Sequence, residues 1–164
     1  MSFSDANIIA LIECPKTTTK APRREMRLER GSLRNDAELI SEDGEHHFRL
    51  FVRQSAEFLE SFSIGLIYEP RDGSSSITLL RCNGPHGQHR NIPFAPDEHF
   101  HYHIHEATAA AIAEGERAER YAEKTDKYAA FEQALAYFLR RINLLDRDVH
   151  FPWLKQLPLW PQDH

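Results

Sequence analysis

The chain has 164 residues, of which 41% are hydrophobic, and it carries a formal net charge of -5 at pH 7. That length is typical of one domain with one core, and the acidic balance argues against a general nucleic-acid-binding surface. No apolar run approaches the ~18 residues of a membrane span, the amino terminus lacks the pattern of a signal peptide, and the two cysteines form no disulfide framework, so we expect a cytoplasmic protein without a membrane partner.

The amino-terminal segment, residues 1–34, predicts a short helix followed by a basic connection. Ser4 is placed to cap a helix that carries four aliphatic residues and ends before Pro15. Residues 16–24 show no periodicity, which predicts an exposed connection. Seven Lys or Arg residues lie between Lys16 and Arg34. They form either a rim that binds phosphate or a solvated arm.

Residues 44–106 have the patterns of a sheet. Apolar side chains alternate with polar ones from Phe48 to Val52 and again from Phe62 to Tyr68, and a third apolar run spans Ile77 to Cys82. The residues that join the second and third runs are Pro70, Arg71, Asp72, Gly73 and three serines, a turn composition that favours an antiparallel hairpin. Chain order then predicts a meander.

A strand of histidines extends this meander. His99, His101, His103 and His105 occupy every second position, so all four imidazoles are predicted to line one surface. The residues between them are Phe100, Tyr102 and Ile104, which suit the core. The pattern indicates an imidazole face that points away from the core on a rigid support.

Residues 107–144 read as helical, and residues 145–164 as an irregular tail rich in Pro and Trp. The spacing of three and four from Tyr128 to Ile142 predicts a helix that packs its apolar stripe on the sheet, with Asp126 as its cap. The whole chain, residues 1–164, is therefore predicted to be a single α+β domain. It would have about four to five mainly antiparallel strands, a short amino-terminal helix and a carboxy-terminal helix on one face.

The turn before the histidine strand adds further polar groups. Residues 83–88 contain two glycines, which either permit the turn or let the backbone approach a ligand. A strand and this turn would bring several side chains to the edge of the imidazole face. They are Arg81, Asn83, His86, His89, Arg90 and Asn91.

The run LLRCNGPHGQHRN, followed by HYHIHEAT and YAEKTDKYAAFEQALAYFLRRINL, resembles small bacterial and phage proteins of unknown function with an Asn-Gly-Pro-His turn and an HxHxAT segment. The resemblance covers roughly residues 44–144. Such proteins are often grouped with toxin–antitoxin loci, in which small α+β ribonucleases are common. The resemblance implies cleavage of RNA on an open sheet face and an antitoxin protein as a partner, although the acidic net charge departs from that pattern.

The same residues suit a metal-independent endoribonuclease that needs no cofactor. Its chemistry requires a base for the ribose 2′-hydroxyl, an acid for the leaving oxygen and a cation for the phosphate. We assign the acid–base pair to His101 and His103 and the phosphate clamp to Arg90. The predicted substrate contacts are Arg81, Asn83, His86, His89, Asn91 and His105.

Two other functions stay open at this point. His101, His103 and His105 have a spacing that lets imidazoles share one zinc, nickel or manganese ion, which would make the protein a metal-binding hydrolase. The protein could also be a non-catalytic interaction module, in which the histidines only form hydrogen bonds at the sheet surface.

Overall fold

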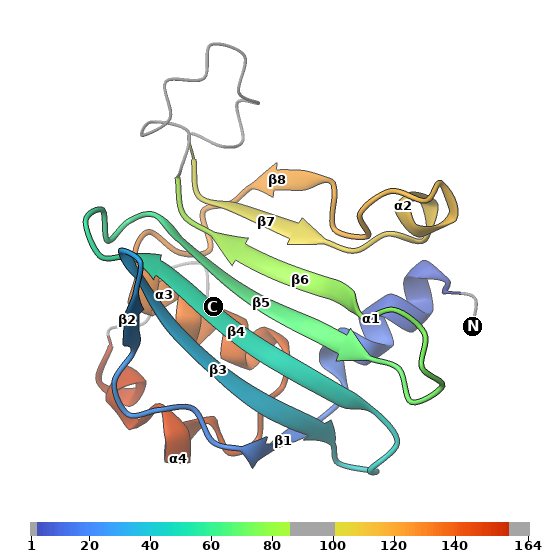
Figure 1. The fold of residues 1–164 in the computed structure, drawn as a ribbon, viewed down its shortest axis with the longest axis horizontal. Helices are drawn as coiled ribbons and strands as arrows, with labels where there is room; N and C mark the ends of the chain where they lie inside the picture. The colour runs from blue at the N-terminus through green and yellow to red at the C-terminus, as the bar shows by residue number, and fades with distance from the viewer. Residues whose placement is uncertain (1–2, 86–100, 158–164) are drawn as a thin grey trace.

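The computed structural model describes residues 3–85 and 101–157. They form an eight-stranded antiparallel sheet in the order β1-β3-β4-β5-β6-β7-β8, with β2 paired to β3. The strands are β1 (Lys16–Lys20), β2 (Arg27–Glu29), β3 (Ser32–Ser41), β4 (His47–Ser55), β5 (Phe62–Glu69), β6 (Ile77–Asn83), β7 (His103–Glu106) and β8 (Ala122–Lys124). Figure 1 shows helices α1 (Asp5–Glu13) and α3 (Phe131–Arg141) behind this sheet, whose other face is turned to the viewer.

The α+β class and the antiparallel meander from β4 to β7 were predicted correctly, but the strand number was not. The predicted sheet of 44–106 is wrong at both ends, since strands begin at Lys16 and continue to Lys124. Strands β1, β2 and β8 have three to five residues and little apolar content, so they give no clear period. In β3 two of the buried positions are polar, Asn35 and Ser41, which hides the alternation.

The two main helices follow the sequence signals in most respects. Ser4 caps α1, because its side chain accepts a hydrogen bond from the backbone N–H of Asn7. Helix α3 buries its predicted stripe, including Leu135 and Phe138. It begins later than expected, however, with Ala130 at the N-cap and no side-chain cap, so the role predicted for Asp126 was wrong.

The predicted helical segment 107–144 holds strand β8 as well as α3 and the short helix α2 (Ala109–Ala113). The tail contains α4 (Arg147–His150) and a 3-10 helix, η3 (Pro152–Gln156), where an irregular chain was predicted. None of the helices in residues 3–85 and 101–157 has the length and apolar character to cross a membrane.

The sheet divides its side chains between a core face and an open face. In β4 and β5 the even-numbered residues are buried in the core against α1 and α3, among them Phe48, Leu50, Ile64 and Leu66. The odd-numbered residues point to the face that these helices leave uncovered. The register places two rows across this open face, Arg34-Arg53-Ser63-Asn83-His103 and Asp36-Phe51-Gly65-Arg81-His105.

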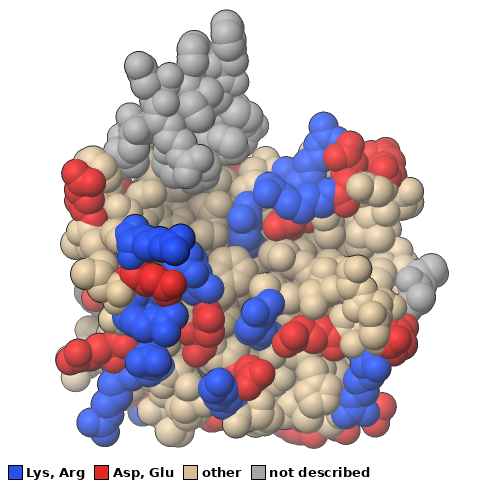
Figure 2. Space-filling view, in the orientation of Figure 1, with Lys and Arg blue, Asp and Glu red and all other residues tan. Residues whose placement is uncertain are grey.

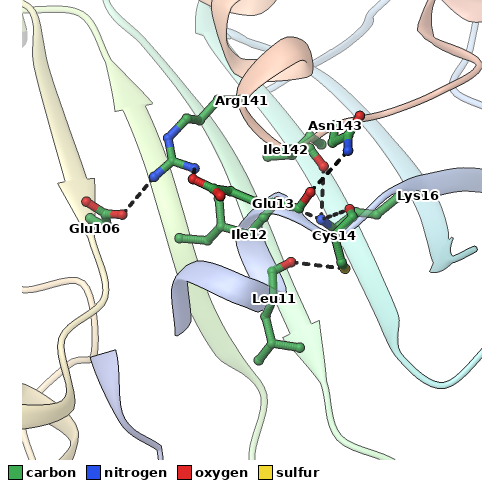
Figure 3. Close-up of polar contacts among 9 residues, drawn as sticks. All are labelled: Leu11, Ile12, Glu13, Cys14, Lys16, Glu106, Arg141, Ile142 and Asn143. Atoms are coloured by element: carbon green, nitrogen blue, oxygen red, sulfur yellow. Dashed lines mark hydrogen bonds and ion pairs between the residues drawn. The ribbon is translucent and has the colours of Figure 1, made fainter. Parts of the chain in front are cut away.

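Lys16 joins the helical layer to the edge of the sheet. Its side chain is fully buried, and its Nζ donates to the backbone carbonyls of Ile12 at 2.7 Å, Cys14 at 2.9 Å and Ile142 at 2.9 Å (Figure 3). These carbonyls lie at the carboxy-terminal ends of α1 and α3, where helices leave acceptors without partners and carry partial negative charge. The exposed connection predicted for residues 16–24 was therefore wrong at Lys16, since two helix ends converge on its ammonium group.

The environment of Lys16 is apolar as well as hydrogen-bonded. Its Nζ lies 4.7 Å from the centroid of the Phe48 ring. Burial lowers the pKa of Lys16 to about 8, whereas lysine in an unfolded chain has a pKa of about 10.4. Arg141 acts in the same direction, and it pairs with Glu13 at 3.3 Å and Glu106 at 2.9 Å, which also links α3 to α1 and β7.

We expect Lys16→Met to lower the free energy of unfolding at pH 7 by about 2–4 kcal/mol. Methionine keeps the apolar stem but leaves three carbonyls without their donor, and each buried unsatisfied group costs about 1–3 kcal/mol. The substitution also removes the cost of desolvating the ammonium group, which offsets part of that loss. Chemical denaturation of both proteins measures the difference.

The same pair of proteins tests the pKa of Lys16. Between pH 8 and 10.5 the unfolded chain binds more protons at Lys16 than the folded one, so the wild type should gain up to about 3 kcal/mol relative to the variant as the pH rises. A difference that stays constant over this range would contradict the buried ammonium.

Candidate functional site

Strand β7 separates its imidazoles from its apolar side chains as the alternation predicts. The rings of His103 and His105 lie on one face with centroids 5.1 Å apart. Tyr102 packs on the other side, against Tyr128 at 5.7 Å and Phe62 at 6.2 Å between ring centroids. The strand begins at His103, so His101 precedes it and is exposed, and His99 lies outside the described residues.

The expectation that these imidazoles point to solvent was wrong for two of them. His103 is completely buried and His105 is 3% exposed. Each ring satisfies its Nδ1 with a backbone carbonyl at 2.8 Å, that of His101 for His103 and that of Glu119 for His105. Because a carbonyl only accepts, Nδ1 is the protonated nitrogen in both rings and Nε2 is the acceptor.

His103 is further held by a chain of side chains across the sheet. Its Nε2 lies 3.4 Å from the amide nitrogen of Asn83, whose oxygen accepts from the hydroxyl of Ser63 at 2.7 Å. The Tyr128 hydroxyl donates to the backbone oxygens of Asn83 at 2.9 Å and His103 at 2.8 Å. Both ring nitrogens of His103 therefore have protein partners, and this imidazole positions Asn83 rather than offering a free proton acceptor.

His105 has a different role because its ring lines a pocket. Burial lowers its pKa to about 4, and the positive charge of Arg81 acts in the same direction. The imidazole is consequently neutral at pH 7, with its Nδ1–H fixed on the Glu119 carbonyl. Among residues 3–85 and 101–157 no group bonds its Nε2, which can accept a hydrogen bond or a proton from a ligand.

The pocket on the open face has a volume of about 570 Å³ and gathers four arginines, one each from the β2–β3 turn, β4, β6 and the segment before β8. They are Arg30, Arg53, Arg81 and Arg117. Ser63, Asn83 and His105 line the same space. Figure 2 shows the open face hollowed near its centre, with basic surface on both sides of the hollow.

Local backbone geometry and ion pairs hold these arginines in place. Arg30 and Gly31 have φ of 52° and 78°, the left-handed values of the two-residue turns that connect twisted hairpins. Glu119 is 4% exposed and lies 3.6 Å from Nε of Arg81 and 3.3 Å from Nε of Arg117. Arg53 pairs with Asp36 at 2.7 Å, outside the pocket lining.

Arg81 is only partly satisfied by its carboxylate neighbour. Its Nε is buried and has no hydrogen-bond partner within the described residues, because the Glu119 oxygen is too distant for a hydrogen bond. A buried donor without a partner is costly, so the Arg81 guanidinium is held at some expense of free energy beside Glu119.

The structure brings together Arg81, Asn83 and His105 from the predicted substrate contacts. The predicted phosphate clamp, Arg90, and the predicted contacts His86, His89 and Asn91 lie outside the described residues. Sequence reasoning missed Arg30, Arg53 and Arg117, although the alternation of β4 already indicated that Arg53 points away from the core. Gly84 packs on the carbonyl of Glu60 and the Phe62 ring, where an added Cβ would collide, so here it serves the fold.

Among residues 3–85 and 101–157, no group of three or more His, Cys, Asp or Glu side chains is arranged to hold a metal ion. Of the three alternative ligands, His101 is exposed, whereas Nδ1 of His103 and of His105 is occupied by a carbonyl, and Nε2 of His103 lies 3.4 Å from the amide nitrogen of Asn83. The metal alternative stays a prediction.

Comparison with protein-family models, curated proteins and solved structures gave no match. The resemblance to toxin–antitoxin proteins consequently stays a prediction.

The depressed pKa of His105 predicts acid sensitivity. Its folded pKa of about 4 lies below the value near 6.5 of an unfolded chain, so the unfolded state binds more protons between these values. The stability contributed by neutral His105 is complete above pH 6.5 and is lost as the pH falls through 4, by up to about 3 kcal/mol.

Denaturation of the wild type and His105→Asn at pH 7 and pH 4 measures this effect. Asparagine keeps a donor near the position of Nδ1 but does not titrate. The wild type should lose more stability than the variant on acidification, and equal losses would contradict a buried neutral imidazole.

Proposed function

We propose that the protein binds a phosphate-bearing ligand, single-stranded RNA, in the pocket of its open sheet face. The observation that supports this most is the convergence of four arginines on one pocket that also contains Asn83 and His105. Guanidinium groups bind phosphate oxygens through two parallel hydrogen bonds, and all four of these arginines line the same pocket.

The overall negative charge is compatible with such a site. A formal charge of -5 disfavours diffuse attraction of nucleic acid, whereas four arginines around one pocket create a local positive field. The ligand would therefore contact only a few phosphates. For at most four arginine contacts, the logarithm of affinity should fall with the logarithm of salt with a slope no steeper than about -3, from ~0.7 per phosphate of a single strand.

RNA cleavage is the second candidate activity, favoured by the neutral imidazole beside Arg81. Nε2 of His105 would take the proton of a ribose 2′-hydroxyl, and the 2′-oxygen would attack phosphorus. The bond to the 5′-oxygen would break, and this oxygen would receive a proton. Arg81 would stabilise the extra charge on phosphorus.

This proposal revises the assignment of the acid–base pair. His103 uses both ring nitrogens within the protein, so His105 takes the role of base. We retain His101, which is exposed, as the proposed acid.

Arg117→Ala should weaken binding of a labelled eight-nucleotide oligouridylate by about 5- to 10-fold and make the salt slope shallower by about 0.7, because one phosphate contact is lost. Arg120→Ala is the matched control, since Arg120 is an exposed arginine of the same segment that pairs with Glu116 and does not line the pocket. Titration at 50 and 200 mM salt measures both effects. Equal losses in the two variants would place the RNA elsewhere, and absence of binding by the wild type would overturn the proposal.

Cleavage, if His105 is the base, should fall by about 10²-fold or more in His105→Asn while binding of oligouridylate changes little. Because the pKa of His105 is about 4, the rise of the rate with pH should occur near pH 4 rather than near pH 6.5. Single-turnover assays of both proteins, with and without a chelator, measure these effects. Cleavage that needs a divalent ion would instead favour the metal-dependent reaction, and unchanged cleavage in the variant would exclude His105 as the base.

A further inference from the structure

Phe51 is an aromatic residue on the open face, where Arg49 and Arg53 flank it on β4 and Asp36 lies opposite it on β3. It is partly exposed and belongs neither to the core cluster nor to the hydrophobic residues packed against that cluster. Its register partner on β5 is Gly65. A Cβ at position 65 would collide with Cε1 and Cζ of the Phe51 ring, so the outer part of the ring occupies the space above this glycine.

The glycine lets the ring lie on the sheet beside the pocket. Gly65 pairs with Arg81 on its other side, so the ring extends across β5 in the direction of an arginine that lines the pocket. Arg53, another lining residue, places its guanidinium 5.6 Å from the centroid of the Phe51 ring. The ring is therefore next to Arg53 and on the same row of the sheet as Arg81, two of the cations proposed to hold phosphate.

We propose that Phe51 stacks a nucleobase of the single-stranded RNA whose phosphate lies in the arginine pocket. This inference rests on the proposed function and names the part of the ligand that the arginines do not recognise. Proteins that bind single strands combine a basic groove with aromatic side chains on which bases stack, and each stack contributes about 1–3 kcal/mol. Stacking uses the π-face that every base has, so the site selects unpaired nucleotides rather than a sequence.

The variants that test this stack are Phe51→Leu, which keeps apolar volume but removes the π-face, and Phe51→Trp, which enlarges it. Ile67→Ala is the control, because Ile67 is a partly exposed apolar residue on the same face of β5 and pairs with Arg49. Thermal unfolding of each variant establishes that it is folded. The probes are the eight-nucleotide oligouridylate, uridine monophosphate and an inorganic polyphosphate of similar charge.

Phe51→Leu should weaken binding of the oligouridylate by about 5- to 100-fold, the equivalent of one stacked base, and leave polyphosphate binding within about twofold. Ile67→Ala should change neither. Phe51→Trp should bind the oligouridylate at least as tightly as the wild type, and its added indole fluorescence should be quenched by the oligouridylate but not by polyphosphate.

Unchanged oligouridylate binding in Phe51→Leu, with polyphosphate still bound, would overturn the stack and leave the phosphate pocket standing. Failure of the wild type to bind either polyanion would remove the proposed function and the stack together. If uridine monophosphate binds as tightly as the oligouridylate, the proposed RNA strand is wrong and the ligand is a free nucleotide.

Discussion

The buried ammonium group of Lys16 is the constraint on which the arrangement of the two layers depends. It draws the carboxy-terminal ends of α1 and α3 to one point at the edge strand β1, where three carbonyls would otherwise be buried without donors. The parallel bridge between Lys16 and Leu144 adds backbone contacts at the same place. Both helices are thereby fixed on one face of the sheet, and they leave the other face to the polar rows.

That division explains why the polar site can be rigid. Arg53, Arg81 and His105 lie on strands whose alternate side chains are buried in the core, so their backbone positions are set by packing that does not involve the ligand. Glu119 supports the site from within, since its carboxyl group lies beside two arginines and its carbonyl orients His105. A buried carboxylate among the arginines also limits their net charge, which suits selective binding of a phosphate better than strong attraction of any polyanion.

The two buried histidines show how position within the sheet separates chemically identical groups. His103 lies opposite Asn83, whose amide nitrogen contacts Nε2 of the ring, whereas His105 lies opposite Arg81 and lines the pocket. The difference arises from the neighbouring strand β6. Its residue Asn83 makes the His103 imidazole a structural support, whereas the His105 imidazole stays a neutral acceptor.

The sequence by itself determined the features that depend on neighbours along the chain. The Ser4 cap of α1, the buried stripe of α3, the meander from β4 to β7 and the alternation around His103 and His105 all follow from local spacing and capping chemistry. It also singled out Arg81, Asn83 and His105. Only the tertiary structure decided that Lys16 is buried, that short polar strands complete the sheet, and that Arg30, Arg53 and Arg117 join Arg81. These outcomes depend on strand register and on the meeting of helix ends far apart in the sequence, which local periodicity does not encode.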